Sequence, residues 1–353
     1  MDHSTLQILW FILIAVLFIG YFILEGFDFG VGINVYALGR RDETRQRMIL
    51  RSIGPVWDGN EVWLLTGGGA LFAAFPEWYA SLFTGFYLAL LLILLALIVR
   101  VCAFKYRDKI DSPRWRAGWN LMHFLGGLLP ALLWGVAFAN IVQGVGLNQH
   151  KEVTTTLLGL LNPFGLLGGI VFVLLFWLHG TLFLALKVDG KLREDANRLA
   201  GILIYPTIVA GAAFLLWTQF AYSNKLWTWI PLIIAALALV AIIPLNRMRR
   251  EGWSFAATSL AIAMAAVVLF GSLFPNVLPS TTDPAFSLTI YNASSTKYTL
   301  EVMTIATICL LPFVLAYQAW TYWVFRRRIT EDEIPASAGL LPRAKDAYRK
   351  AFS

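Results

Sequence analysis

Residues 6–38 read LQILWFILIAVLFIGYFILEGFDFGVGINVYAL, and this stretch decides the class of fold. It is almost entirely apolar, and a helix needs roughly 20 such residues to cross a bilayer core of about 30 Å. Backbone polar groups in lipid must be hydrogen-bonded within the protein, and the stretch lacks the apolar–polar alternation of a barrel strand. The sequence therefore predicts a transmembrane helix.

Eight further apolar segments follow the first one along the chain. They span 53–75, 79–104, 117–142, 160–186, 199–222, 227–245, 253–274 and 299–325. The 353 residues are 58% hydrophobic and 14% charged, whereas soluble domains carry about 25% charged residues. We expect an all-α membrane protein of nine transmembrane helices, with one polytopic domain over 1–329 and a short polar tail over 330–353.

Lysine and arginine are distributed unevenly between the connecting loops. All but three of the 28 lie in alternate loops, at 40–51, 100–116, 187–198 and 247–250, and in the tail after residue 325. The exceptions are Lys151, Lys225 and Lys297. The positive-inside rule then places the N-terminus outside and the C-terminus in the cytoplasm. The net charge of +7 thus reflects topology, and nucleic-acid binding is not expected.

Two pairs of acidic residues lie inside predicted membrane helices. Glu25 with Asp28 and Asp58 with Glu61 are each spaced i, i+3, which puts each pair on one helical face. At 1.5 Å per residue they lie about 6 Å (Asp58), 10 Å (Glu61), 15 Å (Asp28) and 20 Å (Glu25) from the cytoplasmic helix ends. Intramembrane acids are usually functional. Together with Asn60 and water, this graded series predicts a proton path from the cytoplasm.

The acidic residues also fit several further roles. Neutral acids in interhelical hydrogen bonds would contribute about 0.6–2 kcal/mol each, and Asp58 lies close to a helix start. A proton-coupled secondary transporter, a proton-handling subunit of a respiratory complex and a purely structural partner all fit the pattern. A transporter of this type would show paired inverted repeats with broken helices, and we find no obvious repeat in the sequence.

Two histidines and one arginine also fall within the apolar segments. His123 and His179 could each ligate a haem iron. They stand without a second axial-ligand pattern or a CxxCH site, so polar packing near the cytoplasmic interface is the favoured interpretation. Arg100 lies near the end of the segment 79–104. We expect its side chain to extend to the lipid headgroups, and pairing with an acid is the alternative.

Specific motifs resemble one known family. GFDFGVG at 26–32 and PVWDGNEVW at 55–63 are similar to the two signature segments of subunit II of the cytochrome bd-type quinol oxidases. The similarity continues through GGGALFAAFP, LLWGVAFAN, LNPFGLLGG, LFPNVLPS and YNASSTKYTLEVMT to WVFRRRITEDEI, and so covers nearly the whole chain. The resemblance implies two four-helix bundles plus a ninth peripheral helix.

The resemblance also implies a function for the complex and a partner. In this family subunit I carries haems b558, b595 and d and the quinol site, and the pair reduces O2 to water with cytoplasmic protons. Subunit II ligates no haem, catalyses nothing alone, supports haem assembly and supplies part of a proton route. The location implied is the bacterial cytoplasmic membrane, among membrane lipids. Small accessory subunits and a structural quinone occur in some members, and nothing in the sequence places either.

The family's motif positions can be carried over residue by residue. Trp57 and Asp58 match a polar cluster of the family, and Asp28 matches the acid of GFD. Glu25 stands where relatives often have Asp, which keeps the carboxylate. Lys105 stands where some relatives have an acid, which argues against proton uptake at that position. The proton-path residues are therefore expected to be Asp58, Glu61, Asp28, Glu25, Trp57 and Asn60.

Overall fold

The structure is a computed structural model that describes residues 1–40 and 42–334. Over these residues the chain forms eleven α-helices and one two-stranded hairpin. The α-helices are α1 (His3–Ala37), α2 (Glu43–Ile53), α3 (Trp57–Ala74), α4 (Pro76–Gly85), α5 (Tyr87–Tyr106), α6 (Pro113–Gln143), α7 (Pro163–Lys187), α8 (Gly190–Trp217), α9 (Trp229–Arg247), α10 (Glu251–Leu273) and α11 (Lys297–Val324). The strands are β1 (Asn276–Leu278) and β2 (Leu288–Thr289), and short helical turns span Thr218–Tyr222, Leu226–Thr228, Pro284–Phe286 and Glu331–Glu333.

Eight helical stretches of the described chain are long and apolar enough to cross a membrane. They are His3–Ala37, Tyr87–Tyr106, Pro113–Gln143, Pro163–Lys187, Gly190–Tyr222, Leu226–Arg247, Glu251–Leu273 and Lys297–Val324. The helix predicted over 53–75 is α3, which has 18 residues and carries three polar side chains in its first turns, so it is not among the eight. The segment 79–104 is divided at Phe86 between α4 and α5.

The arginine-rich connection after α1 contains a helix, α2, where the apolar pattern predicts only a loop. The Asp42 carboxylate caps it by accepting a hydrogen bond from the backbone N–H of Arg45 (3.0 Å). Met48, Ile49 and Ile53 form its buried side. The charged residues on the opposite side hid this helix from a search for long apolar segments, although the cap and the i, i+1, i+5 apolar spacing were present.

The helix α1 contacts α3, α6, α7 and α10. Glycines allow it to pack closely against these neighbours. A methyl group on Gly30 would overlap the carbonyl oxygen of Phe176, and one on Gly180 would overlap the α1 backbone. Small residues at helix crossings let backbones approach closely in membrane proteins. Gly30, in the GFDFGVG stretch, thus allows α1 and α7 to pack with their backbones in contact.

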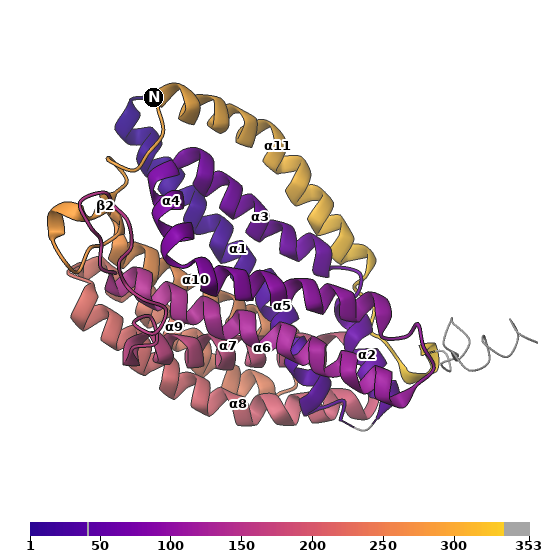
Figure 1. Ribbon diagram of the computed structural model, residues 1–353. Coiled ribbons are helices and arrows are strands. Elements are labelled where there is room, and N and C mark those ends of the chain that lie inside the picture. The colour runs from indigo at the N-terminus through magenta and orange to yellow at the C-terminus, as the bar shows by residue number, and fades with distance from the viewer. Residues whose placement is uncertain (41, 335–353) are drawn as a thin grey trace, which may run out of the picture.

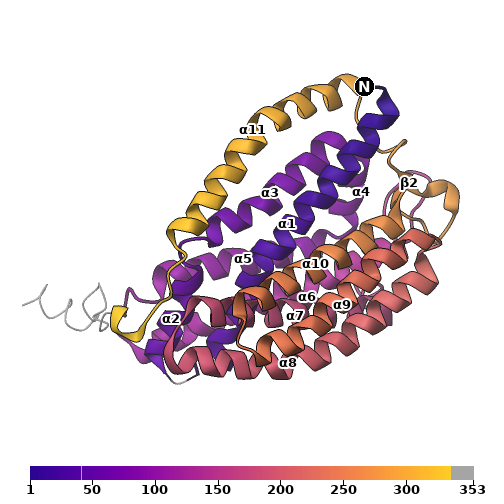
Figure 2. The same cartoon turned by 180° about the vertical axis from the view of Figure 1, so that it is seen from behind.

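The helix α11 stands apart from the rest of the bundle. In Figures 1 and 2 it runs along one edge, beside α3 and the N-terminal part of α1. Of its 28 residues only Leu300 is buried. Its outer side carries exposed apolar side chains such as Ile308, Phe313 and Trp320. Most of the surface of α11 is therefore left uncovered by the rest of the chain.

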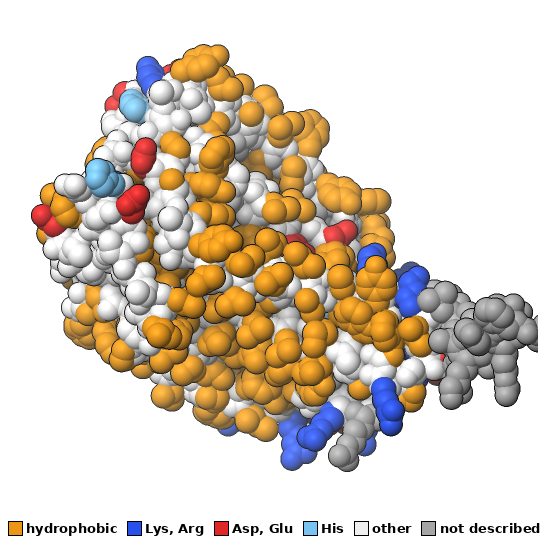
Figure 3. Space-filling model, viewed as in Figure 1, with side chains coloured by type: hydrophobic (Ala, Val, Ile, Leu, Met, Phe, Trp, Pro, Cys, Tyr) orange, Lys and Arg blue, Asp and Glu red, His pale blue; other side chains and the backbone are white. Residues whose placement is uncertain are grey.

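Apolar and charged side chains divide the surface. Figure 3 shows hydrophobic side chains over the sides of the helices, while most Lys and Arg side chains gather at one end. We call this the basic end; it holds α2, the connection between α5 and α6, and residues 326–334. An apolar lateral surface with charge at the ends is what a bilayer requires of a multi-pass protein.

Candidate functional site

An ion pair lies at the centre of the helices. Arg100 of α5 donates from Nη2 to Oε1 of Glu25 on α1, and both side chains are 0% exposed. The guanidinium also lies over the Phe29 ring, with its carbon 5.1 Å from the ring centroid. An unpaired charge is very costly in such an interior, so each ion depends on the other. The expectation that Arg100 extends to the headgroups is therefore wrong. The absence of a side chain at Gly126 leaves room for Arg100 between the helices, and the Glu25 carboxylate pairs with its guanidinium.

The second acidic pair lies at the start of α3. Glu61 Oε2 is 3.9 Å from Arg100 Nη2, and its side chain is 20% exposed. Asp58 is exposed in the first turn of α3, where its Oδ1 accepts a hydrogen bond from the backbone N–H of Gly59 (2.9 Å). A carboxylate in this position is favoured by the helix dipole. Glu61 thus connects the exposed Asp58 end to the buried pair.

Asn60 joins three helices around Asp28. Its Nδ2 donates to Asp28 Oδ2 (2.8 Å) and to the carbonyl of Leu24 (3.3 Å), both on α1. Its Oδ1 accepts from the Tyr322 hydroxyl (2.6 Å) and from Gln318 Nε2 (3.2 Å), both on α11. The acidic stretches of α1 and α3 meet at this point. Tyr322 and Gln318 were missed, although polar groups inside an apolar segment could have flagged them.

Aromatic rings close the site on the α5 side. Trp57 stacks on Phe104, with centroids 5.5 Å apart and an interplanar angle of 14°. The other contact of Phe104 is edge-on with His123, at 4.5 Å. Trp57 therefore lies beside the acids, and among the described residues it makes no hydrogen bond to them.

The two helical histidines differ in their surroundings. His179 has both ring nitrogens engaged, Nδ1 with Thr258 Oγ1 (2.7 Å) and Nε2 with the carbonyl of Ile23 (3.0 Å). This is the polar packing that the sequence favoured for it. His123 is 1% exposed. Its ring packs edge-on against Phe104, and neither ring nitrogen makes a hydrogen bond with a described residue.

Several buried polar atoms around the ion pair have no hydrogen-bond partner among the described residues. They are Glu25 Oε2, Asp28 Oδ1, Nε and Nη1 of Arg100, and both ring nitrogens of His123. Buried polar groups are normally bonded, either to protein or to ordered water. Their concentration in one place makes this centre suited to binding internal water, which is what proton transfer between separated side chains requires.

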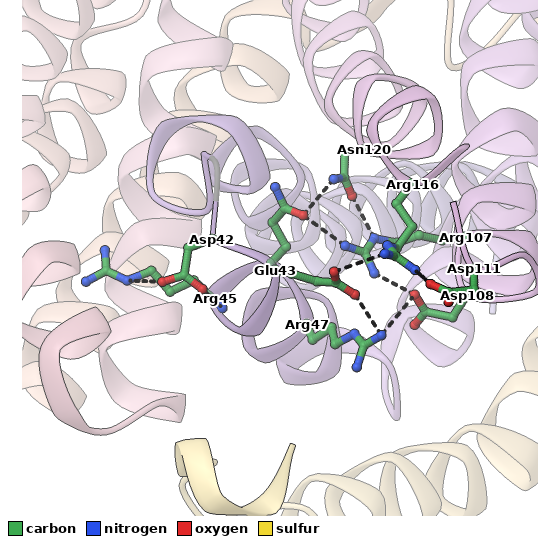
Figure 4. Close-up of polar contacts among 10 residues, drawn as sticks. Asp42, Glu43, Arg45, Arg47, Arg107, Asp108, Asp111, Arg116 and Asn120 are labelled. Atoms are coloured by element: carbon green, nitrogen blue, oxygen red, sulfur yellow. Dashed lines mark hydrogen bonds and ion pairs between the residues drawn. The ribbon is translucent and has the colours of Figure 1, made fainter. Parts of the chain in front are cut away.

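A second set of charged residues lies at the basic end, and Figure 4 shows it in close-up. On α2, Gln46 Oε1 accepts from Arg107 Nη2 (2.9 Å) and from Asn120 Nδ2 (2.8 Å). Arg107 also donates to Asn120 Oδ1 (2.7 Å) and to Asp108 Oδ1 (2.6 Å). The pKa of the Arg107 guanidinium is lowered by burial, and the neighbouring Asp108 carboxylate offsets only part of this shift. These bonds tie α2 to the α5–α6 connection.

The outer part of this cluster consists of ion pairs that share partners. Glu43 pairs with Arg47 (2.8 Å) and with Arg116 (3.2 Å), and Arg116 also pairs with Asp111 (3.0 Å). The carboxylates are 40–44% exposed, so water reaches them. We call the set formed by Glu43, Gln46, Arg47, Arg107, Asp108, Asp111, Arg116 and Asn120 the basic-end cluster.

A cavity of about 310 Å³ opens beside the basic-end cluster. Its lining comes from the end of α1, from α2 and from the start of α6, and includes Tyr36, Arg40, Gln46 and Asn120. We call it the basic-end cavity. It leaves room for water between these three helices. Among the described residues, no group of three or more His, Cys, Asp or Glu side chains is placed to hold a metal ion.

The fold and the centre together define a class: a multi-pass membrane protein that holds paired ionisable side chains between its helices. The family described as cytochrome bd terminal oxidase subunit II matches residues 6–325. The chain belongs to this family, as its motifs predict, and is thereby a subunit of an oxidoreductase complex.

Curated relatives extend over almost the full chain. The cytochrome bd ubiquinol oxidase subunit 2 of Bacillus subtilis (strain 168) is 40% identical over 336 residues, which are 94% of this chain and 98% of that protein. The cytochrome bd-I ubiquinol oxidase subunit 2 of Escherichia coli (strain K12) is 38% identical over 370 residues, covering 94% and 97%. The bd oxidase of Geobacillus thermodenitrificans has a chain of the same fold, with a TM-score of 0.74 at 21% identity, covering 91% of this chain and 98% of that one.

Proposed function

We propose that this chain is the non-haem subunit of a bd-type quinol oxidase in a bacterial cytoplasmic membrane. It pairs with a haem-bearing subunit I, which carries haems b558, b595 and d, and the complex oxidises quinol and reduces O2 to water. The family match over residues 6–325 and the ubiquinol oxidase names of the relatives support this proposal. The chain itself supports assembly of the haem-bearing subunit and supplies protons from the cytoplasm.

The proton path runs from Asp58 through Glu61 to the Glu25–Arg100 pair. The observation that carries it is the position of Glu61, which is partly exposed and yet 3.9 Å from an arginine that is 0% exposed. Asp28 and Asn60 lie beside this path and connect it to α11. Protons enter at the exposed Asp58 carboxylate, and the unpaired polar atoms of the centre hold the water that carries them further.

We also propose nine membrane spans, with α3 as the ninth because the helices beside it cross the membrane. The gathering of Lys and Arg at the basic end supports a cytoplasmic C-terminus and an outer N-terminus. The exposure of α11 supports its role as the peripheral helix beside two four-helix bundles. Residues 1–329 form the single membrane domain. Of the polar tail proposed at 330–353, residues 335–353 lie outside the described residues.

A first experiment tests the subunit assignment. The tagged chain is gently purified from its native membrane and reduced with dithionite, and its absorption spectrum is recorded. We expect haem b and haem d bands carried by a larger co-purifying chain. A colourless chain that purifies alone, from cells shown to express the partner, would contradict the assignment and would direct attention to proton-coupled transport.

A second experiment tests the proton path. The double variant Asp58→Asn, Glu61→Gln is compared with Glu77→Gln, which removes an exposed acid from the first turn of α4. We expect slower proton uptake and slower turnover in the double variant, with normal haem content, and unchanged rates in the control. Normal uptake in the double variant would exclude this path.

A further inference from the structure

His123 lies in a column of polar side chains between α5 and α6. Arg100 and Arg107 are seven residues apart on α5 and its C-cap, and Asn120 and His123 are three residues apart on α6, so each pair shares a helical face. The His123 ring packs edge-on against Phe104 of α5, and Asn120 accepts a hydrogen bond from Arg107. The imidazole therefore lies on α6 between Asn120, a member of the basic-end cluster, and Gly126, which contacts Arg100.

The basic-end cavity brings water to the top of this column. Asn120 lines the cavity and is 4% exposed, so it lies at the inner wall of the cavity. His123 is the next polar residue on that face of α6, and its nitrogens have no hydrogen-bond partner among the described residues. On the inner side, Glu25 Oε2 is likewise without a partner among them. A polar side chain, Asn120, thus lies on the cavity side of the imidazole, and a carboxylate oxygen without a partner among the described residues belongs to the buried pair.

We propose that His123 passes protons from the basic-end cavity to the Glu25 carboxylate, as an inlet separate from the Asp58–Glu61 path. This inference rests on the proposed function, because the chain must take up protons for a second inlet to matter. In the transfer, an N–H bond forms at the ring nitrogen facing the cavity. The N–H bond at the other nitrogen breaks, and its proton reaches Glu25 through water. No other reactant is consumed.

His179 shows what a purely structural histidine looks like in this protein. It is as deeply buried as His123, but Thr258 and the carbonyl of Ile23 occupy both of its nitrogens. A ring held in this way has no nitrogen left to receive a proton from one side and release it on the other. The contrast between the two rings is the reason for assigning a relay to His123, and it makes His179 the matched control.

The test replaces each ring by alanine in the complete complex. His123→Ala is added to the Asp58→Asn, Glu61→Gln variant, in which the other inlet is closed. We expect it to slow the remaining proton uptake by about tenfold, since a positioned proton-transfer group contributes at least this much. Added imidazole should restore this uptake by occupying the space of the lost ring. Imidazole should not change uptake in His179→Ala, because both nitrogens of that ring are held by hydrogen bonds within the protein. Remaining uptake that His123→Ala does not slow would overturn the inference.

A second variant leaves His123 intact and blocks the cavity instead. Tyr36→Cys, made with Cys102→Ser and Cys309→Ser, is labelled with a bulky thiol reagent; Tyr36 is exposed and lines the cavity. The same label at Tyr298→Cys, an exposed position on α11, is the control. Slower uptake only with the label at position 36 supports the inlet, and equal rates refute it.

The two proposals fail in different ways. If the Asp58→Asn, Glu61→Gln variant slows uptake while His123→Ala and the blocked cavity do not, the proposed function stands and the His123 inlet is wrong. If uptake stays unchanged even when all three changes are combined in one complex, the chain does not take up protons through either path, and the proposed proton function is wrong as well.

Discussion

The buried centre and the basic-end cluster use the same side-chain types in different surroundings. Glu25 and Arg100 are 0% exposed and form one ion pair. In the basic-end cluster, Glu43 is 40% exposed and divides its carboxylate between Arg47 and Arg116. Removing one member of the centre leaves an opposite charge in the protein interior, whereas water and a second partner compensate for the loss of Arg47 or Arg116. Burial, rather than the type of pair, decides how much each residue matters.

The largest effect is expected from breaking the buried pair. Arg100→Met should destabilise the chain by about 3–5 kcal/mol, because Glu25 is left buried without its partner. The measurement is thermal unfolding of the purified complex. The double variant Arg100→Met, Glu25→Gln removes both charges and should recover most of the loss. A single variant as stable as the unchanged complex would mean that the centre is as well hydrated as the basic end.

A smaller effect is expected at the polar bridge beside the pair. Asn60→Ala leaves Asp28 Oδ2 and the Tyr322 hydroxyl without their partner, and a buried polar group that loses its partner costs about 1–3 kcal/mol. Asn148→Ala, at an exposed amide that pairs with Glu152, is the control and should change stability little. Thermal unfolding of both variants checks this. Equal, small effects would contradict the view that Asn60 joins α1, α3 and α11.

Sequence reasoning found the apolar helices because each carries its own signal, and α1 was expected at 6–38 and begins at His3. It also placed the acids of α1 and α3 in one graded series of depths, and the two helices meet where Asn60 donates to Asp28. It did not find the partner of Glu25, because Arg100 is 75 residues away and its own segment does not show which way it points. Tyr322 is 262 residues from Asn60 and was missed for the same reason. Pairings between distant helices depend on packing, which hydropathy does not encode.

The smallest effect is expected at the basic end. Arg116→Met removes two ion pairs, but Glu43 keeps Arg47 and Asp111 faces water, so the loss should be within about 0.2–1 kcal/mol per pair. Because these charges are partly exposed, salt should reduce even this difference. Thermal unfolding of Arg116→Met and Arg100→Met at low and high salt provides the comparison. The Arg116 effect should shrink as salt is added, while the Arg100 effect should persist, since ions do not reach a side chain that is 0% exposed. A salt-sensitive Arg100 effect would place the centre in contact with the aqueous phase and erase the distinction between the two regions.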